Sequence, residues 1–577
     1  MRIVKLSVEN FRGIQELEWM PQRQPLCCLI GPGDSGKSTV LDAIEAALSS
    51  RWYTFGEGDF RECDTSRPIR IEVTIAELSR PLLSDEKFGL YIRGLTPDDT
   101  LRDEPEDGDE PVLTVRLTVD ATMEPVWEVV NDRTTYPRTM SNRDRALFRV
   151  VRLTGDDARH LTWGQGSILS KLTDSGDEAA QQLAEAYRVA KASTRLHEIE
   201  SLAKVAKEAQ ARAVEVGAIV ENGYLPGLEL LKGGFSSGSI ALHDGAVPLR
   251  LAGTGTRRLA TLAIQRAAID EGAIILVDEI EQGLEPHRIL GAIVHLRQSQ
   301  AAAAAARQPA GQIVMTTHSD VALSEIPSEG LYVCRRKAAG ALKILHPTDQ
   351  DALRRVLKHM PRALFARRIL VCEGDTELGL MLGLRELFPA RHDGASIEQR
   401  GAAIVDGGGT NAPQIATALA ALGYATALYR DSDVRVPTKQ QRSLDAAGAH
   451  TITYPTEMAI EEALFAGVFD DDLVDELLGE AERYKGEATV IDQLNKAFPE
   501  AEPNGIGNST FKDMDFQLGL ERDEIMKRLG RLAKHYAWFK NQYIARGLAP
   551  VVDKAIAQSP TSEFAQALIE IEGWLYA

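Results

Sequence analysis

Acidic side chains gather at two places in the second half of the chain, each directly after an apolar run. Glu373 and Glu377 follow residues 367–372, and Asp431 and Asp433 follow residues 425–430. Carboxylate oxygens are the ligands that Mg²⁺ and Mn²⁺ prefer, and no His or Cys pair stands beside them to favour zinc. The pattern therefore indicates a site for a hard divalent cation.

The surrounding pattern predicts how these carboxylates are brought together. Strand-like runs at 367–372, 402–406 and 425–430 alternate with helical stretches such as 413–422. Such repeats build a parallel sheet, whose functional sites lie at the carboxyl ends of its strands. Four carboxylates stand at predicted strand ends, namely Glu373, Asp406, Asp431 and Asp433. Glu377 follows Glu373 by four positions, so it can face the same site from the first helical turn. Any one of these acids alone would more often be a surface carboxylate; together they favour a site.

A phosphate-binding pattern lies near the start of the chain. A strand-like run at 26–30 leads into GPGDSGKST at residues 31–39, and a helical stretch at 40–48 follows. Glycines let backbone N–H groups surround the phosphates, Lys37 can reach the terminal phosphates and Ser38 can bind Mg²⁺. We expect ATP with Mg²⁺ here. The predicted nucleotide-binding residues of this loop are Gly31, Gly33, Asp34, Ser35, Gly36, Lys37, Ser38 and Thr39.

Two further apolar runs end in residues that are typical of an ATPase, and they occur in the chain order that is usual for one. The apolar run 273–277 ends in Asp278 and Glu279, which could hold Mg²⁺ and polarise the attacking water respectively. The run 312–317 ends in His318, which could sense the γ-phosphate. A lone His would more often be structural, but its place in this order favours function.

A second small-residue segment lies between the phosphate loop and these strand ends. Gly253 and Gly255 occur in LAGTGTRRL, just before a helical stretch that reaches residue 269. Small residues that open a helix form a second anion site. The sequence identifies no residue for the glutamine loop that such ATPases usually carry.

Bulk properties set broad limits. A chain of 577 residues predicts two to four domains. The net charge of −19 argues mildly against a protein that coats nucleic acid, but a local basic groove remains compatible with it. Five cysteines without metal or disulfide spacing fit a reducing compartment. With no evident signal peptide or membrane-length apolar run, a cytoplasmic protein without a membrane partner is expected.

The central part of the chain has less distinctive patterns. Strand-like segments at 69–75 and 112–119 are separated by a predicted acidic linker at 96–110. A polar stretch at 178–220 has apolar residues at spacings of three and four, which is typical of a helix. It could form a short dimerisation arm or an ordinary helical subdomain.

The motifs together resemble known families. The loop, signature-like segment, Asp-Glu strand end and His resemble ATPases of the ABC, RecF and SMC type, although LAGTG departs from the usual Leu-Ser-Gly-Gly-Gln. E-G-x-x-E after one strand and D-x-D after a later one resemble a Toprim domain. With the start NFRG at 10–13, this order resembles the OLD (overcoming lysogenisation defect) nucleases, a group that includes Gabija-type antiphage nucleases. The resemblance covers roughly residues 1–465.

The resemblance implies roles for particular residues. Glu373 and Glu377 match the two Toprim glutamates, and Asp431 with Asp433 matches the D-x-D pair. The family implies a further acid and a late lysine. Glu461 is the favoured acid, with Glu457 and Glu462 as alternatives, and Lys540 is the favoured lysine, with Lys534 as the alternative.

The expected architecture is α/β: an ABC/RecF-like ATPase with a helical dimerisation insert, then a Toprim-type parallel domain with a helical C-terminal tail. The expected domains are residues 1–175 (ATPase N-terminal lobe), 176–222 (helical arm or dimerisation insert), 223–355 (ATPase C-terminal lobe) and 362–577 (Toprim nuclease domain).

The resemblance implies an ATP-binding, ATP-hydrolysing DNA endonuclease that uses two Mg²⁺ or Mn²⁺ ions and acts in antiphage defence. It would work as a homodimer or higher even oligomer, with a helicase or another defence protein as a partner. Two alternatives stay open: an effector that cleaves RNA or tRNA with a partner protein, and a non-catalytic ATP-switched DNA-repair clamp.

Overall fold

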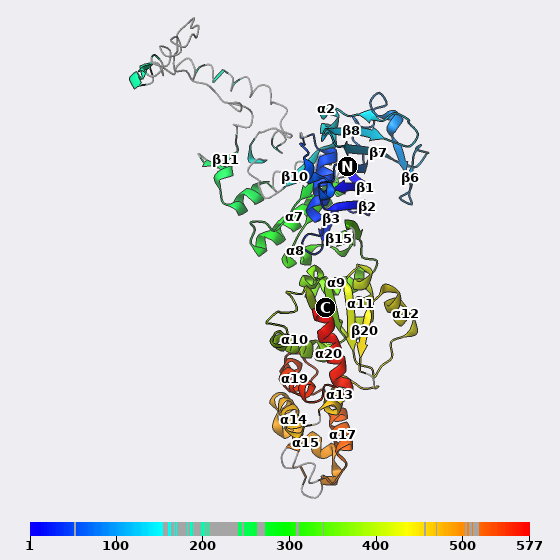
Figure 1. The fold of residues 1–577 in the computed structure, drawn as a ribbon, viewed down its shortest axis with the longest axis vertical. Coiled ribbons are helices and arrows are strands. Elements are labelled where there is room, and N and C mark those ends of the chain that lie inside the picture. Colours follow the sequence, from blue (N-terminus) through cyan, green and yellow to red (C-terminus); the bar gives the residue numbers. More distant parts are fainter. Residues whose placement is uncertain are drawn as a thin grey trace. The chain divides into compact units, whose positions relative to one another are not determined.

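The structure is a computed structural model that describes most of the chain outside residues 154–271. It describes residues 1–50, 53–153, 160–162, 241–244, 247–261, 272–306, 311–337, 340–454, 457–468, 470–501, 505–506, 510–511 and 518–577, with scattered residues between 167 and 207. The predicted helical arm at 178–220 lies largely outside these residues. By its internal contacts the chain divides into two compact units, Met1–Cys27 with Ser38–Thr317, and Cys28–Lys37 with His318–Ala577 (Figure 1).

The first unit contains an antiparallel sheet in the order β2-β1-β4-β7-β8. Its strands are β1 (Arg2–Phe11), β2 (Ile14–Trp19), β4 (Ile69–Ala76), β7 (Glu110–Val119) and β8 (Pro125–Val130). The predicted strands at 69–75 and 112–119 are confirmed. The interior positions of β1 and β4 carry fully buried Ile, Leu and Val side chains, so burial of one face specifies the register.

The predicted acidic linker at 96–110 is wrong in part. β6 (Leu101–Arg102) pairs antiparallel with β5 (Arg93–Leu95), which in turn pairs with β7. The Nε of Arg93 forms an ion pair of 3.1 Å with Asp103. Charged side chains therefore support a short hairpin here, which an apolar alternation pattern does not detect.

The first unit also contains three parallel strands in the order β10-β13-β14. These are β10 (Val150–Leu153), β13 (Ile274–Val277) and β14 (Gln312–Thr316), and every residue in them is buried. Strands that are buried along their whole length are typical of parallel sheets covered on both faces. The predicted strands before Asp278 and His318 are confirmed. Other elements in the unit are β9 (Arg138–Thr139), α2 (Asn142–Arg145), β11 (His243–Asp244), β12 (Val247–Pro248) and α7 (Pro286–Ala305).

The phosphate loop connects β3 (Leu26–Ile30) to α1 (Lys37–Leu48), as its sequence predicts. Within the second unit, residues 28–30 of β3 pair in parallel with β15 (Leu331–Arg336), and β15 pairs with β16 (Ala341–Leu345). The helix α8 (Asp320–Glu325) precedes β15 in the chain. After β16 come α9 (Gln350–His359) and the short helix η11 (Pro361–Phe365).

A separate four-stranded parallel sheet follows, in the order β18-β17-β19-β20. Its strands are β17 (Arg368–Cys372), β18 (Ala402–Asp406), β19 (Ala425–Arg430) and β20 (His450–Thr453), with α10 (Asp375–Leu387), α11 (Ala412–Ala421) and α12 (Thr438–Ala447) between them. Since β17 lies between the later strands β18 and β19, the connections switch sides there. Open α/β sheets bind ligands at such a point.

Helices complete the C-terminal part and pack on this sheet domain. They are α13 (Ile460–Gly467), α14 (Asp471–Lys485), α15 (Glu487–Ala497), α17 (Arg522–His535), α18 (Gln542–Gly547), α19 (Ala549–Gln558) and α20 (Glu563–Tyr576). One hydrophobic cluster joins them to the sheet, and Trp538 is fully buried within it. A Cβ at Gly379 of α10 would lie 2.5 Å from the carbonyl oxygen of Gln542, so the two segments approach closely. The expected parallel α/β domain with a helical C-terminal part is confirmed.

Among the described residues, no helix is both long and apolar enough to cross a membrane.

Candidate functional site

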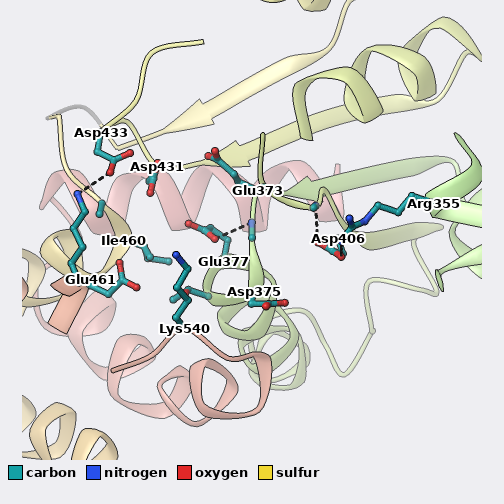
Figure 2. Close-up of a pocket in the computed structure, with 16 residues that line it drawn as sticks. Arg355, Glu373, Asp375, Glu377, Asp406, Asp431, Asp433, Ile460, Glu461 and Lys540 are labelled. Carbon is teal, nitrogen blue, oxygen red and sulfur yellow. Dashed lines mark hydrogen bonds and ion pairs between the residues drawn. The ribbon is translucent and has the colours of Figure 1, made fainter. Parts of the chain in front are cut away.

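A pocket of about 400 Å³ lies at the carboxyl ends of β17 and β19. It is bordered by the start of α10, the start of α13 and the segment between α17 and α18. Figure 2 shows the side chains of Glu373, Glu377, Asp431 and Glu461 directed toward the same space. The ionisable residues that line it are Arg355, Glu373, Asp375, Glu377, Asp406, Asp431, Asp433, Glu461, Lys534 and Lys540.

Glu373 is fixed at the end of β17 by main-chain and side-chain contacts. Its N–H donates to the carbonyl of Tyr429 at 2.9 Å, and its own carbonyl accepts from Gly409 N–H at 2.6 Å. Its carboxylate accepts a hydrogen bond of 3.1 Å from the Nε of Arg430. The Arg430 side chain is only 7% exposed. The buried guanidinium of Arg430 thus holds the Glu373 carboxylate in the wall of the pocket.

Glu377 lies on the first turn of α10, as its spacing predicts. Its Oε2 accepts from the N–H of Gly374 at 3.1 Å, which closes the start of the helix. Burial, with the charges of the nearby carboxylates Glu373 and Glu461 acting in the same direction, raises the pKa of Glu377 to about 7. The site therefore keeps a carboxylate that is costly to ionise without a positive charge beside it.

Asp431 and Asp433 have different surroundings despite their spacing of two residues. Burial raises the pKa of Asp431 to about 8, and its hydrogen bond with Asp433 and the charge of Glu373 act in the same direction. Burial would also raise the pKa of Asp433, but hydrogen bonding from Lys534 lowers it below its usual value. The Nζ of Lys534 lies 2.8 Å from Asp433 Oδ2. Asp433 is the ionised member of the pair.

The two late candidates, Glu461 and Lys540, also reach this pocket. Glu461 belongs to the first turn of α13 and is 6% exposed. Burial raises its pKa, against the opposing charges of Lys540 and Lys534. Figure 2 shows the Lys540 side chain reaching in between Glu461 and Glu377. Lys534, the alternative lysine, lines the pocket as well.

The remaining acidic candidates lie in different settings. Glu457 is exposed and forms an ion pair of 2.7 Å with Arg435. Glu462 accepts from the N–H of Ala459 at 3.1 Å. Neither is among the residues that line the pocket.

Asp406 stands at its strand end as expected, but its carboxylate is bound by Arg355 Nη2 at 2.6 Å and by Gly408 N–H at 2.8 Å. Sequence reasoning missed Arg355, whose helix has no motif. It also missed Arg430, for which the only signal was a cation directly before Asp431.

The carboxylate oxygens that line this pocket are possible ligands for a cation. Among the described residues, no three His, Cys, Asp or Glu side chains form a closed cluster able to hold a metal ion; the carboxylates line a pocket instead. Their chemistry nevertheless fits, because the facing donors are oxygens. Burial raises the pKa values of Glu377, Asp431 and Glu461, and repulsion from neighbouring carboxylates acts in the same direction. A divalent cation would relieve that repulsion. Glu373, Glu377, Asp431, Asp433 and Glu461 are the residues that would hold Mg²⁺ or Mn²⁺.

Replacing Glu377 by Gln is expected to stabilise the metal-free protein. The folded-state pKa of about 7 exceeds the ordinary value of 4.5, so this group favours the folded state below pH 4.5, and that contribution is lost as pH rises through 7. At pH 8 the free energy of unfolding of the Gln variant should exceed that of wild type by up to about 3 kcal/mol. This difference should shrink toward pH 5. Thermal unfolding in EDTA across this pH range measures it. Glu398→Gln, an exposed control, should change stability by less than about 0.5 kcal/mol. Equal stability of the Glu377 variant and wild type at pH 8 would contradict the expectation.

The predicted Mg²⁺-binding residues of the ATPase motifs meet within the first unit. Asp278 Oδ1 accepts from Ser38 Oγ at 3.0 Å and from Thr316 Oγ1 at 2.6 Å. Its Oδ2 accepts from the Nη2 of Arg152 at 2.8 Å, a buried arginine for which the sequence held no signal. Glu279 is exposed with a φ of 45°, an uncommon conformation for a non-glycine residue. Such strained positions cluster at functional sites.

Residues 31–37 of the phosphate loop belong to the second unit. Lys37 is 5% exposed, and its Nζ donates to the carbonyls of Gly31 at 3.1 Å and Pro32 at 2.9 Å. Gly31 has a φ of +149°, and a Cβ there would lie 2.6 Å from the carbonyl oxygen of Cys334, so the chain requires glycine. The rest of the predicted loop forms the same turn and helix start, with exposed Gly33 and Asp34, buried Ser35, and half-buried Gly36 and Thr39.

The remaining ATPase candidates, His318, Gly253 and Gly255, have distinct settings. His318 packs its ring on Phe365 of η11, with a centroid distance of 6.1 Å and an interplanar angle of 26°. In the first unit, residues 254–261 are helical directly after Gly253. A Cβ at Gly255 would lie 2.9 Å from the carbonyl oxygen of Gly283.

Known families match three segments of the chain. Residues 1–107 match an AAA ATPase domain. Residues 182–324 match the family described as AAA domain, putative AbiEii toxin, Type IV TA system. Residues 364–433 match the Toprim domain of overcoming lysogenization defect-like proteins. This last segment contains Glu373, Glu377, Asp431 and Asp433.

Individual relatives match this chain either over a short stretch or at low sequence identity. The OLD nuclease of Thermus scotoductus is 36% identical over 73 residues, which is 12% of this chain and 13% of that protein. Among solved structures, the Smc head bound to the C-winged helix domain of ScpA has 15% identity and a TM-score of 0.33, over 60% of this chain and 97% of that one. A Smc head with an extended coiled coil, bound to the C-terminal domain of ScpA derived from Pyrococcus furiosus, has 14% identity and a TM-score of 0.32, over 59% and 95%.

The chain thus carries an OLD-like Toprim domain behind segments of AAA ATPase type. The predicted resemblance to the OLD proteins is confirmed. The finer likeness to Gabija-type nucleases stays a prediction.

Proposed function

We propose that this protein is an ATP-controlled, divalent-metal-dependent endonuclease that hydrolyses phosphodiester bonds, with DNA as its substrate. One observation carries the proposal: carboxylates from β17, β19, α10 and α13 line one pocket with two lysines from the C-terminal helical part. A carboxylate-lined pocket suits phosphodiester hydrolysis because divalent cations bound there polarise the phosphate and activate water. The likeness to a protein named OLD nuclease supports the same class of reaction.

The protein's own groups would prepare the reaction. Arg430 and Lys534 orient Glu373 and Asp433 as ligands through the hydrogen bonds described above. Lys540 places a positive charge in the pocket, where it can neutralise charge that builds up on the phosphate. Glu377 and Glu461 supply further negative charge for the cations. The arrangement resembles the division of labour expected for a site using two metal ions.

The ATPase segments would regulate this site. We assign ATP and Mg²⁺ to the loop 31–39 with Asp278, hydrolysis to Glu279 and His318, and closure of the site to Gly253 and Gly255 of a second copy. The proposed domains are the ATPase lobes 1–175 and 223–355, the arm 176–222 and the nuclease domain 362–577. ATP binding between two copies would then gate cleavage within a dimer or a higher even oligomer.

Cleavage assays test the proposal directly. The purified chain is incubated with supercoiled plasmid and, separately, with an RNA transcript, in Mg²⁺ or Mn²⁺, with and without ATP, and in EDTA. We expect plasmid cleavage in the metal-containing reactions and none in EDTA. Cleavage of RNA alone would replace DNA by RNA as the substrate. Failure to cut either substrate under every condition would leave a non-catalytic ATPase clamp as the better explanation.

The biological setting is also a proposal. The likeness to OLD-type proteins supports a role in antiphage defence, together with a helicase or another partner. Phage plaque counts on cells that express wild type or a Glu373→Gln variant test this role. Equal counts in the two strains would contradict it.

A further inference from the structure

The acidic pocket needs positive side chains to receive a polyanionic strand. Lys534 is bound to Asp433, and it also lies 3.5 Å from Glu462. Both Lys534 and Lys540 come from the C-terminal helical part of the chain. Figure 2 shows a third cation, Arg355, on the opposite side of the pocket from Asp433. Arg355 belongs to α9 and precedes the segment that matches the Toprim family at 364–433.

Within the part of the chain that the structure describes, the Arg355 guanidinium is held by one carboxylate, that of Asp406. Its Nη2 donates to Asp406 Oδ2 at 2.6 Å, and the other oxygen of Asp406 accepts from Gly408 N–H at 2.8 Å. The Arg355 side chain remains 41% exposed. A guanidinium carries five N–H donors in a planar fork, so the bond to Asp406 leaves donors for a phosphate.

The glycine loop after β18 is shaped around this guanidinium. Gly408 has a φ of +68°, and a Cβ there would lie 2.3 Å from the Cζ of Arg355. The next residue, Gly409, has a similar φ of +70°, but a Cβ there would meet nothing within 4 Å. The backbone strain at the two positions is therefore alike, and only Gly408 makes room for Arg355.

We infer that Arg355 binds a phosphate of the substrate strand on the side of the scissile bond opposite Lys534, and that Asp406 is its positioning residue. This inference rests on the proposed nuclease function and deepens it. The strand would be held at two places, by a lysine from the C-terminal helices and by an arginine from the helix that precedes the Toprim domain. Asp406 then serves the guanidinium rather than a metal ion.

Neighbouring arginines on α9 give a matched test. Arg354 is 63% exposed, pairs with Asp351 at 3.0 Å and does not line the pocket. The probes are a short fluorescein-labelled DNA duplex and an RNA strand of the same sequence, with binding followed by anisotropy in EDTA and cleavage followed in Mg²⁺. Arg355→Ala should weaken binding and raise KM by about tenfold, with kcat changed less than about threefold. The slope of log K against log salt should fall by about 0.9 for the duplex or 0.7 for the single strand. Arg354→Ala should leave binding and slope as in wild type.

The glycine pair tests the geometry without removing the arginine. Gly408→Ala should reproduce most of the loss in binding, whereas Gly409→Ala, with similar strain, should lose clearly less. Arg355→Lys should restore the salt slope but only part of the affinity, because the fork that Asp406 holds is lost. Thermal unfolding of each variant verifies that it is folded.

The outcomes separate this inference from the proposed function. A wild type that neither binds nor cuts either probe overturns the proposed function, and this inference with it. A wild type that binds, with equal affinity and slope for the Arg355 and Arg354 variants, overturns this inference alone. Equal losses for Gly408→Ala and Gly409→Ala would likewise remove the loop's assigned role in shaping the contact.

Discussion

Replacing Glu373 by Gln is expected to lower the rate of nucleic-acid cleavage by about 10³-fold or more, equivalent to about 4 kcal/mol in the activation free energy. Glu373 directly follows the central strand β17, and its carboxylate lines the pocket together with those of Asp431 and Glu377. On the proposed mechanism, loss of one charged oxygen ligand would weaken the binding of the cations that the reaction needs. Initial rates on the substrate that wild type cleaves, measured in Mg²⁺ and in Mn²⁺, give the size of the effect.

The choice of Gln rather than Ala protects the fold. Arg430 is 7% exposed and bonds to Glu373, so an alanine would leave a buried cation without that partner. A Gln side chain keeps an acceptor oxygen in the same place. Thermal unfolding should therefore show a folded variant, and nucleotide binding at the loop 31–39 should be unchanged. Loss of cleavage can then be assigned to the pocket rather than to misfolding.

The matched control is an acid outside the pocket of the same domain. Asp445 lies on α12 and accepts a hydrogen bond of 2.9 Å from Gln441. Asp445→Asn should cleave at the wild-type rate. A folded Glu373→Gln variant that cuts as fast as wild type would show that the assigned pocket is not the site of cleavage.

Much of the pocket could be predicted because its acids are placed by backbone pattern. Strands β18 and β19 have the predicted bounds, and the acids after β17 and β19 line one pocket because parallel strands end at one edge. Glu377 follows from helical spacing. The late acid Glu461 and Lys540 came from family resemblance, since their distance in sequence carries no periodic signal that joins them to the strands.

The partners of these acids could not be predicted in the same way. Arg355 and Asp406 are separated by 51 positions and meet only because α9 folds against the loop after β18. The sequence pattern grouped Asp406 with the other acids at strand ends, whereas the structure pairs it with the cation Arg355. The hairpin β5–β6 was missed for a related reason: charged residues rather than an apolar alternation hold it.

Replacing Lys37 by Ala is expected to weaken ATP binding by about 30–150-fold, the effect of losing a charge-assisted contact worth about 2–3 kcal/mol. The Lys37 ammonium donates to neutral groups of its own loop, namely the carbonyls of Gly31 and Pro32 and the hydroxyl of Ser35. These contacts hold the side chain over the loop, ready to exchange them for phosphate oxygens. Binding of a fluorescent ATP analogue to the nuclease-impaired Glu373→Gln protein, with and without the second change, measures the loss.

The control for this variant is Lys343, an exposed lysine on β16. Lys343→Ala should bind the analogue as wild type does, and unchanged binding by Lys37→Ala would reject the phosphate-loop assignment. The same Lys37→Ala protein should also lose whatever change ATP makes in the cleavage rate, because a site that cannot bind ATP cannot respond to it.

Phe365→Ala separates ATP binding from the response of the cleavage rate to ATP. Its ring packs on His318, and Phe365 lies three residues before β17, the strand that Glu373 follows directly. If that contact transmits the nucleotide state, Phe365→Ala should bind ATP normally, cleave at the rate seen without ATP and respond less to ATP. A full response in Phe365→Ala would mean that the nucleotide acts on the nuclease pocket by another route.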